Sequence, residues 1–285
     1  MFIEFVDRGI VIGGFTVYYY GIIIATGMCA AILICSWLLM RKGLPYDAVF
    51  DYAVFAIPAG ILGARVYYLL FPDPNKVHWV QFVGSWTFEN FFAIRNGGLG
   101  IYGGVIIGYL VVWTITKIKK QNFLEVVDTM MPGVLIAQSM GRWGNFINGE
   151  AHGNLITNPN LQWFPYGVLV DGSWYQATFF YESILTLIGF VICLLMLRSK
   201  HYRDGWCLMF YGIYYGTARL IIEGFRTDSL YLTIPDFVNQ RFIETNIRIS
   251  QAVSVIAIVL AVIRLIIMYR KEIASLFTRR RKNLG

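Results

Sequence analysis

The chain has 285 residues, of which 57% are hydrophobic and only 14% are charged, and its mean hydropathy is +0.57. This composition excludes an ordinary soluble domain and is typical of an integral membrane protein. A net charge of +7 would suggest nucleic-acid binding in a soluble protein, but here the basic residues fall in short connections and in the tail, so we expect no nucleic-acid partner.

Seven apolar runs are each close to the ~20 residues that a helix needs to cross the hydrocarbon core of a bilayer. We therefore predict an all-α integral membrane protein whose residues 1–285 form a single polytopic domain. The acidic start and the length of the first run argue against a cleavable signal peptide. The predicted spans are 15–40, 48–71, 97–116, 124–141, 177–197, 205–223 and 249–269.

Basic residues follow every odd-numbered span, beginning with Arg41 and Lys42 after the first. Because cytoplasmic loops carry the excess of lysine and arginine, the N-terminus is predicted outside and the C-terminus in the cytoplasm. The basic tail 279–282 then anchors this topology on anionic lipid. The long connections 72–96, 142–176 and 224–248 fall outside, where we expect them to form a small head.

This orientation brings polar side chains from several spans to the outer level of the membrane. A surplus of arginine at that depth favours an anion, and the abundant local anion is a lipid phosphate. The arginines are Arg65, Arg142, Arg219 and Arg226, the acids are Glu182 and Glu223, and the tyrosines are Tyr20 and Tyr102. On the inner side, Asp51, Glu125 and Asp128 lie near helix starts, where carboxylates suit the helix dipole.

The stretch from Gly141 to Gly153 carries the densest polar signal. Arg142 offers a rigid fork of donors suited to phosphate, Asn145 and Asn148 add uncharged donors and acceptors, and Glu150 adds one negative charge. Glycines at 141, 144, 149 and 153 allow tight turns and close approach to a ligand. These features predict an anion site at the membrane boundary. The alternative is that Arg142 only extends to the interface, as long basic side chains do near helix ends.

Other features each have a structural and a functional interpretation. Arg219 and Glu223 are four residues apart and can pair on one helix face, as a structural bridge or as part of a site. The glycines of 97–108 have a spacing typical of helix packing, whereas Tyr102 among them is the better functional candidate. Of the histidines at 78, 152 and 201, only His152 is placed to matter. The cysteines at 29, 35, 193 and 207 predict neither a disulfide nor a catalytic thiol nor a metal site.

The run Gly141-Arg-Trp-Gly-Asn-Phe-Ile-Asn-Gly-Glu150 resembles the signature of the bacterial prolipoprotein diacylglyceryl transferase family. The likeness extends to Tyr20-Gly21, to the glycines of 97–108, to Tyr181-Glu182-Ser183 and to the pattern from Tyr215 to Arg226. It implies an enzyme of the bacterial plasma membrane that works at the outer leaflet without a cofactor. That enzyme transfers a diacylglyceryl group from phosphatidylglycerol to the lipobox cysteine of a prolipoprotein signal peptide, which forms a thioether and releases glycerol phosphate.

The resemblance implies binding or catalytic roles for Tyr20, Arg142, Asn145, Gly153 and Arg219. Our working hypothesis is that Arg142 with Asn145 holds the lipid phosphate, Arg219 stabilises the departing phosphate, and Tyr102 and Tyr20 orient the thiol. The remaining substrate-binding candidates are Asn148, Glu150, Gly153, Glu223 and Arg226.

Two positions depart from the family pattern. Many relatives have histidine where this chain has Tyr102, and a tyrosine, with an ordinary pKa of about 10, is a poor base at neutral pH. The thiol proton therefore has Glu150 or Glu182 as alternative acceptors. Gln176-Ala177 replaces a histidine-proline pair before the fifth span.

Two other functional classes fit the composition. A lipid transporter or flippase would use the same arginines to pass headgroups, and it predicts a polar path through both halves of the membrane. A lipid-sensing receptor would be expected to carry an appended soluble domain, and none is visible in the sequence.

Overall fold

A computed structural model of the chain describes residues 3–6, 9–43, 48–71, 87–92, 98–227 and 230–282. Seven long helices correspond to the seven predicted runs. Within the described part, five of them are long and apolar enough to cross a membrane (α1, α2, α5, α7 and most of α9), which confirms a helical protein of membrane type. The helices are α1 (Tyr19–Arg41), α2 (Ala48–Leu70), α5 (Ile101–Ile118), α6 (Phe123–Asn148), α7 (Thr178–Arg198), α8 (Trp206–Phe225) and α9 (Ile249–Lys282).

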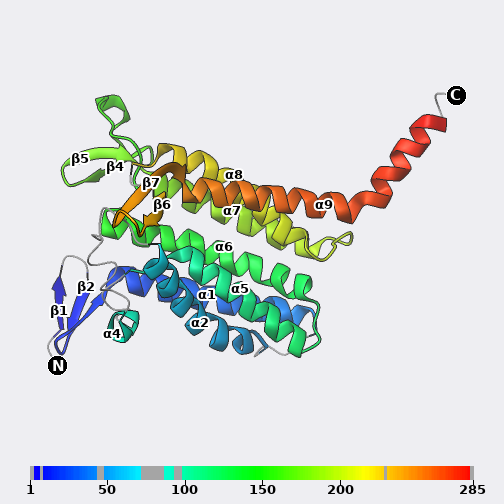
Figure 1. The fold of residues 1–285 in the computed structure, drawn as a ribbon, viewed down its shortest axis with the longest axis horizontal. Helices are drawn as coiled ribbons and strands as arrows, with labels where there is room; N and C mark the ends of the chain where they lie inside the picture. The colour runs from blue at the N-terminus through cyan, green and yellow to red at the C-terminus, as the bar shows by residue number, and fades with distance from the viewer. Residues whose placement is uncertain are drawn as a thin grey trace.

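The long helices lie in two groups, with α1, α2, α5 and α6 on one side and α7, α8 and α9 on the other (Figure 1). Helix α6 packs along both α1 and α7, so it joins the two groups. Helix α2 packs mainly on α5, and α9 packs mainly on α8. The core of the protein therefore centres on α6, the helix that carries most of the predicted anion site.

Short strands cover one end of the bundle, while the α5–α6 and α7–α8 connections lie at the other end (Figure 1). Three strands form an antiparallel sheet in the order β1-β2-β3, and two hairpins, β4-β5 and β6-β7, lie before α7 and α9. The strands are β1 (Ile3–Val6), β2 (Gly9–Ile12), β3 (Phe15–Tyr18), β4 (Gly167–Val170), β5 (Ser173–Gln176), β6 (Tyr231–Asp236) and β7 (Arg241–Arg248), with a short helix α4 (Phe88–Phe92) and a 3-10 turn, Pro159–Leu161, beside them. The β6-β7 register shifts between Tyr231 and Thr233.

Two predicted boundaries need correction. The first span was expected from Phe15, but Phe15–Tyr18 is strand β3, because Gly13 and Gly14 adopt positive φ angles and turn the chain into a hairpin. The outer connection was expected from residue 142, but α6 continues to Asn148 and ends at Gly149, whose φ of 69° gives the left-handed conformation of a helix end. Most of the predicted connection 72–96, including His78, lies outside the described residues.

Helices α2 and α5 approach each other through glycines, which supports the packing interpretation of this part of the sequence. A Cβ added to Gly103 would lie 2.1 Å from the carbonyl oxygen of Gly63, and one added to Gly104 would lie 3.1 Å from that of Gly60. A Cβ added to Gly108, one turn further along α5, would have no atom of the described residues within 4 Å. The close glycine contact therefore lies in the first turn of α5, where it fixes the position of Tyr102 relative to α2.

At the opposite end, Asp128 corrects the prediction that the inner acids balance the dipoles of their own helices. Its buried carboxylate accepts hydrogen bonds from the backbone N–H groups of Gly205 (2.7 Å) and Leu208 (2.8 Å) and from the hydroxyl of Tyr202 (2.5 Å). The two N–H groups, of Gly205 and Leu208, are backbone donors that the start of α8 would otherwise leave unpaired. The start of α6 is capped instead by Asn122, whose side chain accepts from Leu124 N–H (3.2 Å).

We expect Gly103→Ala to lower the thermal midpoint of the detergent-solubilised protein. The added methyl group meets the backbone of α2, and overpacking of this kind costs about 1–3 kcal/mol. Gly108→Ala is the matched control on the same helix, and it should leave the midpoint unchanged because no atom of the described residues lies within 4 Å of its new Cβ. Equal midpoints for the two variants would contradict the close packing of α2 on α5.

Candidate active site

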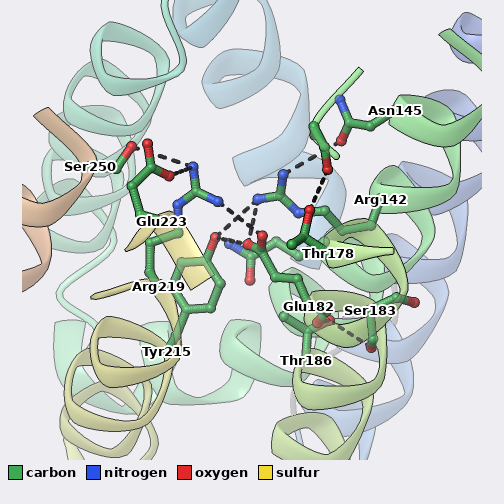
Figure 2. A network of polar contacts seen from close by, with 12 residues as sticks. Arg142, Asn145, Thr178, Glu182, Ser183, Thr186, Tyr215, Arg219, Glu223 and Ser250 are labelled. Atoms are coloured by element: carbon green, nitrogen blue, oxygen red, sulfur yellow. Dashed lines mark hydrogen bonds and ion pairs between the residues drawn. The ribbon is translucent and has the colours of Figure 1, made fainter. Parts of the chain in front are cut away.

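Five charged side chains, from α6, α7, α8 and the residue that follows α8, form a continuous chain with alternating signs. Arg142, Glu182, Arg219 and Glu223 of this chain are labelled in Figure 2. An Arg142 Nη2 lies 2.5 Å from Glu182 Oε1, and Glu182 Oε2 lies 2.9 Å from Arg219 Nη1. On the other side of Arg219, its Nη2 lies 2.7 Å from Glu223 Oε2, which is also 3.8 Å from Nη1 of Arg226. Three guanidinium groups thus alternate with two carboxylates along this chain.

The acids of this chain are more deeply buried than the arginines. The side chains of Glu182 and Glu223 are 3% and 1% exposed, whereas those of Arg142 and Arg219 are 18% and 13% exposed. A buried carboxylate without a partner costs several kcal/mol, so each acid depends on its arginines for stability. An anion that enters the site would meet the guanidinium groups first, because they retain the accessible surface.

Tyr215 completes the junction between the two arginines. Its hydroxyl donates to Glu182 Oε1 (2.9 Å) and accepts from Arg142 Nη2 (3.4 Å). Figure 2 shows the guanidinium groups of Arg142 and Arg219 facing one another, with the Glu182 carboxylate and the Tyr215 hydroxyl between them. The ring of Tyr211 stacks on that of Tyr215 at 5.2 Å.

Tyr215 received no role from the sequence, although a signal was present. Residues 211, 215, 219 and 223 recur at intervals of four, so their side chains share one face of α8. A polar stripe of this kind on an otherwise apolar helix indicates a face that looks away from lipid. Extending the pairing of Arg219 and Glu223 backwards by one and two turns would have found both tyrosines.

The predicted residues at the end of α6 continue the network from Arg142. Arg142 Nη1 donates to Asn145 Oδ1 (3.5 Å), and Asn145 Nδ2 donates to Glu150 Oε1 (2.9 Å). Asn148 Nδ2 donates to the same carboxylate oxygen (3.2 Å). The left-handed turn at Gly149 makes this possible, because it returns Glu150 to the helix end, where the Glu150 N–H donates to the Asn145 carbonyl (3.0 Å).

Two further predicted residues pack beside this network. The ring of Tyr20, in the first turn of α1, lies against Gly144 of α6, where an added Cβ would approach Tyr20 Cδ2 to 2.7 Å. Gly153 is buried, donates its N–H to the Gln176 carbonyl (2.8 Å) and would place a Cβ 2.9 Å from the Thr178 side chain. Gly153 therefore allows the end of β5 to pack closely at the start of α7.

The remaining candidates lie on other elements. Tyr102, in the first turn of α5, donates its hydroxyl proton to Ser250 Oγ (2.8 Å), and that oxygen also accepts from Arg219 Nη2 (3.4 Å). Tyr102 thus joins the charged chain through Ser250, which the sequence did not suggest. Arg65 donates to the Gly98 carbonyl (3.1 Å), so it contacts the segment that leads into α5.

His152 stacks on the ring of Tyr175 in β5 at a centroid distance of 4.2 Å. Among the described residues, no group of three or more histidine, cysteine, aspartate or glutamate side chains has the arrangement of a metal site. Within that part of the chain, the charged side chains around Arg142 and Arg219 are the groups suited to chemistry on an anionic substrate.

Comparison with known proteins places this arrangement in context. The family model described as prolipoprotein diacylglyceryl transferase matches residues 9–267. A Clostridium kluyveri protein named phosphatidylglycerol–prolipoprotein diacylglyceryl transferase is 36% identical over 255 residues, which cover 88% of this chain and 92% of that protein. Proteins of the same name from Streptococcus uberis and Streptococcus pyogenes are each 37% identical, over 92% and 91% of this chain and 94% of their own.

We expect Glu182→Gln to destabilise the protein strongly. Loss of one partner from a buried ion pair costs about 3–5 kcal/mol, and here two arginines lose their shared carboxylate together. The measurement is the thermal midpoint in detergent. The control is Glu125→Gln, which removes a half-exposed pair with Lys42 (3.2 Å) and should cost less than about 1 kcal/mol. A midpoint for Glu182→Gln equal to that of the control would contradict the stabilising role of the shared carboxylate.

Proposed function

The chain belongs to the prolipoprotein diacylglyceryl transferase family, and on that premise we propose that it transfers the diacylglyceryl group of phosphatidylglycerol to the cysteine thiol of a prolipoprotein. It is a transferase, and the reaction is the first step of lipoprotein maturation. The observation that carries the proposal is the buried chain of alternating charges, in which the guanidinium groups of Arg142 and Arg219 face one another. Such a chain offers positive charge at the place where a phosphate leaving group gains negative charge.

The chemistry needs an activated sulfur and a stabilised leaving group. The thiolate, rather than the thiol, attacks the diacylglyceryl carbon that carries the phosphate oxygen. A carbon–sulfur bond forms as the carbon–oxygen bond breaks, and the electron pair leaves on glycerol phosphate. The thiol proton must pass to a base before or during the attack.

We assign Arg142 and Asn145 to hold the lipid phosphate and Arg219 to stabilise the departing phosphate. Arg142 and Arg219 support this assignment because they face one another and keep accessible surface. Arginine suits both roles, because its planar fork binds phosphate oxygens in pairs. Glu223 then holds Arg219 in place from the other side, and Arg226 pairs with the same oxygen of Glu223.

Of the two carboxylates considered for the thiol proton, we favour Glu150. Both oxygens of Glu182 already bind guanidinium groups, and one also accepts from Tyr215. Glu150 is exposed and holds only neutral amide donors in its described contacts, from Asn145 and Asn148. Tyr102 and Tyr20 orient the thiol in this scheme, and no cofactor or metal is required.

We further propose seven spans with the N-terminus outside, in a bacterial plasma membrane, and a site that opens to the outer leaflet. The gathering of the strands at one end of the bundle and of the short connections at the other supports this topology (Figure 1). The short connections carry Arg41, Lys42 and Lys119, which fits a cytoplasmic side. Phosphatidylglycerol and the signal peptide with its lipobox cysteine would both reach the site from the bilayer.

The transporter alternative has less support, because the acids near the opposite end are engaged within the protein. Asp51 pairs with Lys119, Glu125 pairs with Lys42, and Asp128 caps the start of α8. A headgroup that crossed the whole membrane would need polar groups that can exchange partners along its path.

The test uses purified protein with phosphatidylglycerol and a lipobox peptide, and it follows the release of glycerol phosphate. We expect release that requires the peptide cysteine and that falls by about 10²–10³ in Arg142→Ala, the usual cost of removing one transition-state donor. Arg142→Lys keeps the charge but loses the fork, so it should also be impaired.

The control is Arg203→Ala, which removes an exposed pair with Glu272 (2.9 Å) away from the site and should retain wild-type activity. Wild-type activity in Arg142→Lys would contradict binding of phosphate by both arms of the fork. Folded wild-type protein that releases nothing would contradict the transferase and favour the transporter, which a liposome headgroup-flipping assay would then test.

A further inference from the structure

Ser250 occupies the first turn of α9 and is 8% exposed. Its hydroxyl oxygen accepts from the hydroxyl of Tyr102 on α5 (2.8 Å) and from Nη2 of Arg219 on α8 (3.4 Å). We propose that Ser250 is a positioning residue for the transfer reaction, because it holds the Tyr102 hydroxyl at a fixed place beside Arg219. This inference rests on the proposed function.

The placement of Tyr102 depends on this contact because its helix belongs to a different group from α8 and α9. Helix α5 packs mainly on α2, and α9 packs mainly on α8. The ring of Tyr102 rests on that of Tyr67 of α2 at a centroid distance of 5.9 Å, with the rings tilted by 57°. The ring is therefore held from the α2 side, and the hydroxyl is held from the α9 side by Ser250.

Ser250 restricts the hydrogen bonding of both Tyr102 and Arg219. A serine hydroxyl oxygen has two lone pairs, and the contacts with Tyr102 and Arg219 use both. The hydroxyl proton of Tyr102 therefore points to Ser250. The lone pairs of the Tyr102 oxygen then face the site at a fixed angle, where they can accept from the substrate thiol. On Arg219, Nη2 donates to Ser250 Oγ and forms an ion pair with Glu223 Oε2 (2.7 Å), while Nη1 donates to Glu182 Oε2 (2.9 Å).

Loss of the Ser250 hydroxyl should therefore act on the reaction more than on substrate capture. The guanidinium of Arg219 would keep its two carboxylate partners and its charge, so the binding of phosphatidylglycerol should change little. The Tyr102 hydroxyl would lose its anchor and spend less time in the reactive arrangement, which lowers kcat. If the Ser250 contact served only to hold α5 against α9, its loss would instead lower the thermal midpoint and leave the kcat of the folded protein unchanged.

The experiment measures kcat, KM for phosphatidylglycerol and thermal midpoint for Ser250→Ala, Tyr102→Phe and the double variant. Each single variant should lose about tenfold in kcat, the cost of one hydrogen bond at the upper end of the usual range, with KM within about twofold. The double variant should be no slower than the slower single variant, because both remove the same hydrogen bond.

The matched control is Ser254→Ala, one turn further along α9. Ser254 is also buried and donates to the backbone carbonyl of Ser250 (2.7 Å), so its loss should leave kcat at the wild-type value. The inference would be overturned by a wild-type kcat in Ser250→Ala. It would also be overturned if the losses in kcat multiplied to about a hundredfold in the double variant, or if Ser254→Ala lost as much kcat as Ser250→Ala. Wild-type protein without cysteine-dependent release would overturn the proposed function itself, and this inference with it.

Discussion

Charge pairing in an apolar environment is the constraint on which the rest of this structure depends. An ionised side chain inside a membrane is tolerated only when a partner or water compensates it. Here Glu182 on α7 compensates Arg142 on α6 and Arg219 on α8 together, so one carboxylate sets the relative depth and rotation of three helices. The same arrangement concentrates two guanidinium groups at one place, which an isolated ion pair could not do. Stability and the proposed chemistry therefore rest on the same contacts.

The glycine contact between α2 and α5 serves this constraint indirectly. Because Gly103 lies against the backbone of Gly63, the adjacent Tyr102 is carried at the level of the charged chain, and Ser250 receives its hydroxyl. The glycines need no contact with substrate to matter for activity. A small displacement of α5 would move the hydroxyl away from Arg219, since geometry in such sites must be held within a fraction of an ångström.

The features predicted correctly from the sequence are the local ones. Long apolar runs predicted the helices, and the four-residue spacing predicted the pair of Arg219 and Glu223. The sequence also predicted that Glu182 and the arginines lie at a similar depth in the membrane. It could not predict which arginines contact Glu182, because hydropathy does not determine how each helix is rotated about its axis. Ser250 was missed for the same reason. The sequence predicts too early an end for α6, because the glycines after Ser139 favour a turn, whereas the missing side chain of Gly144 accommodates Tyr20 within the helix.

The cap at Asp128 has a consequence for the order of events during biogenesis. Helix α6 leaves the ribosome before α8, yet its Asp128 finds its donors at the start of α8 and its Arg142 finds its acid on α7. A charged side chain within a membrane helix is tolerated when a partner compensates it, and neither α6 nor α8 is among the five described helices that are long and apolar enough to cross a membrane by length and composition. The charges of α6 therefore gain their partners only once α7 and α8 have followed it along the chain and packed against it.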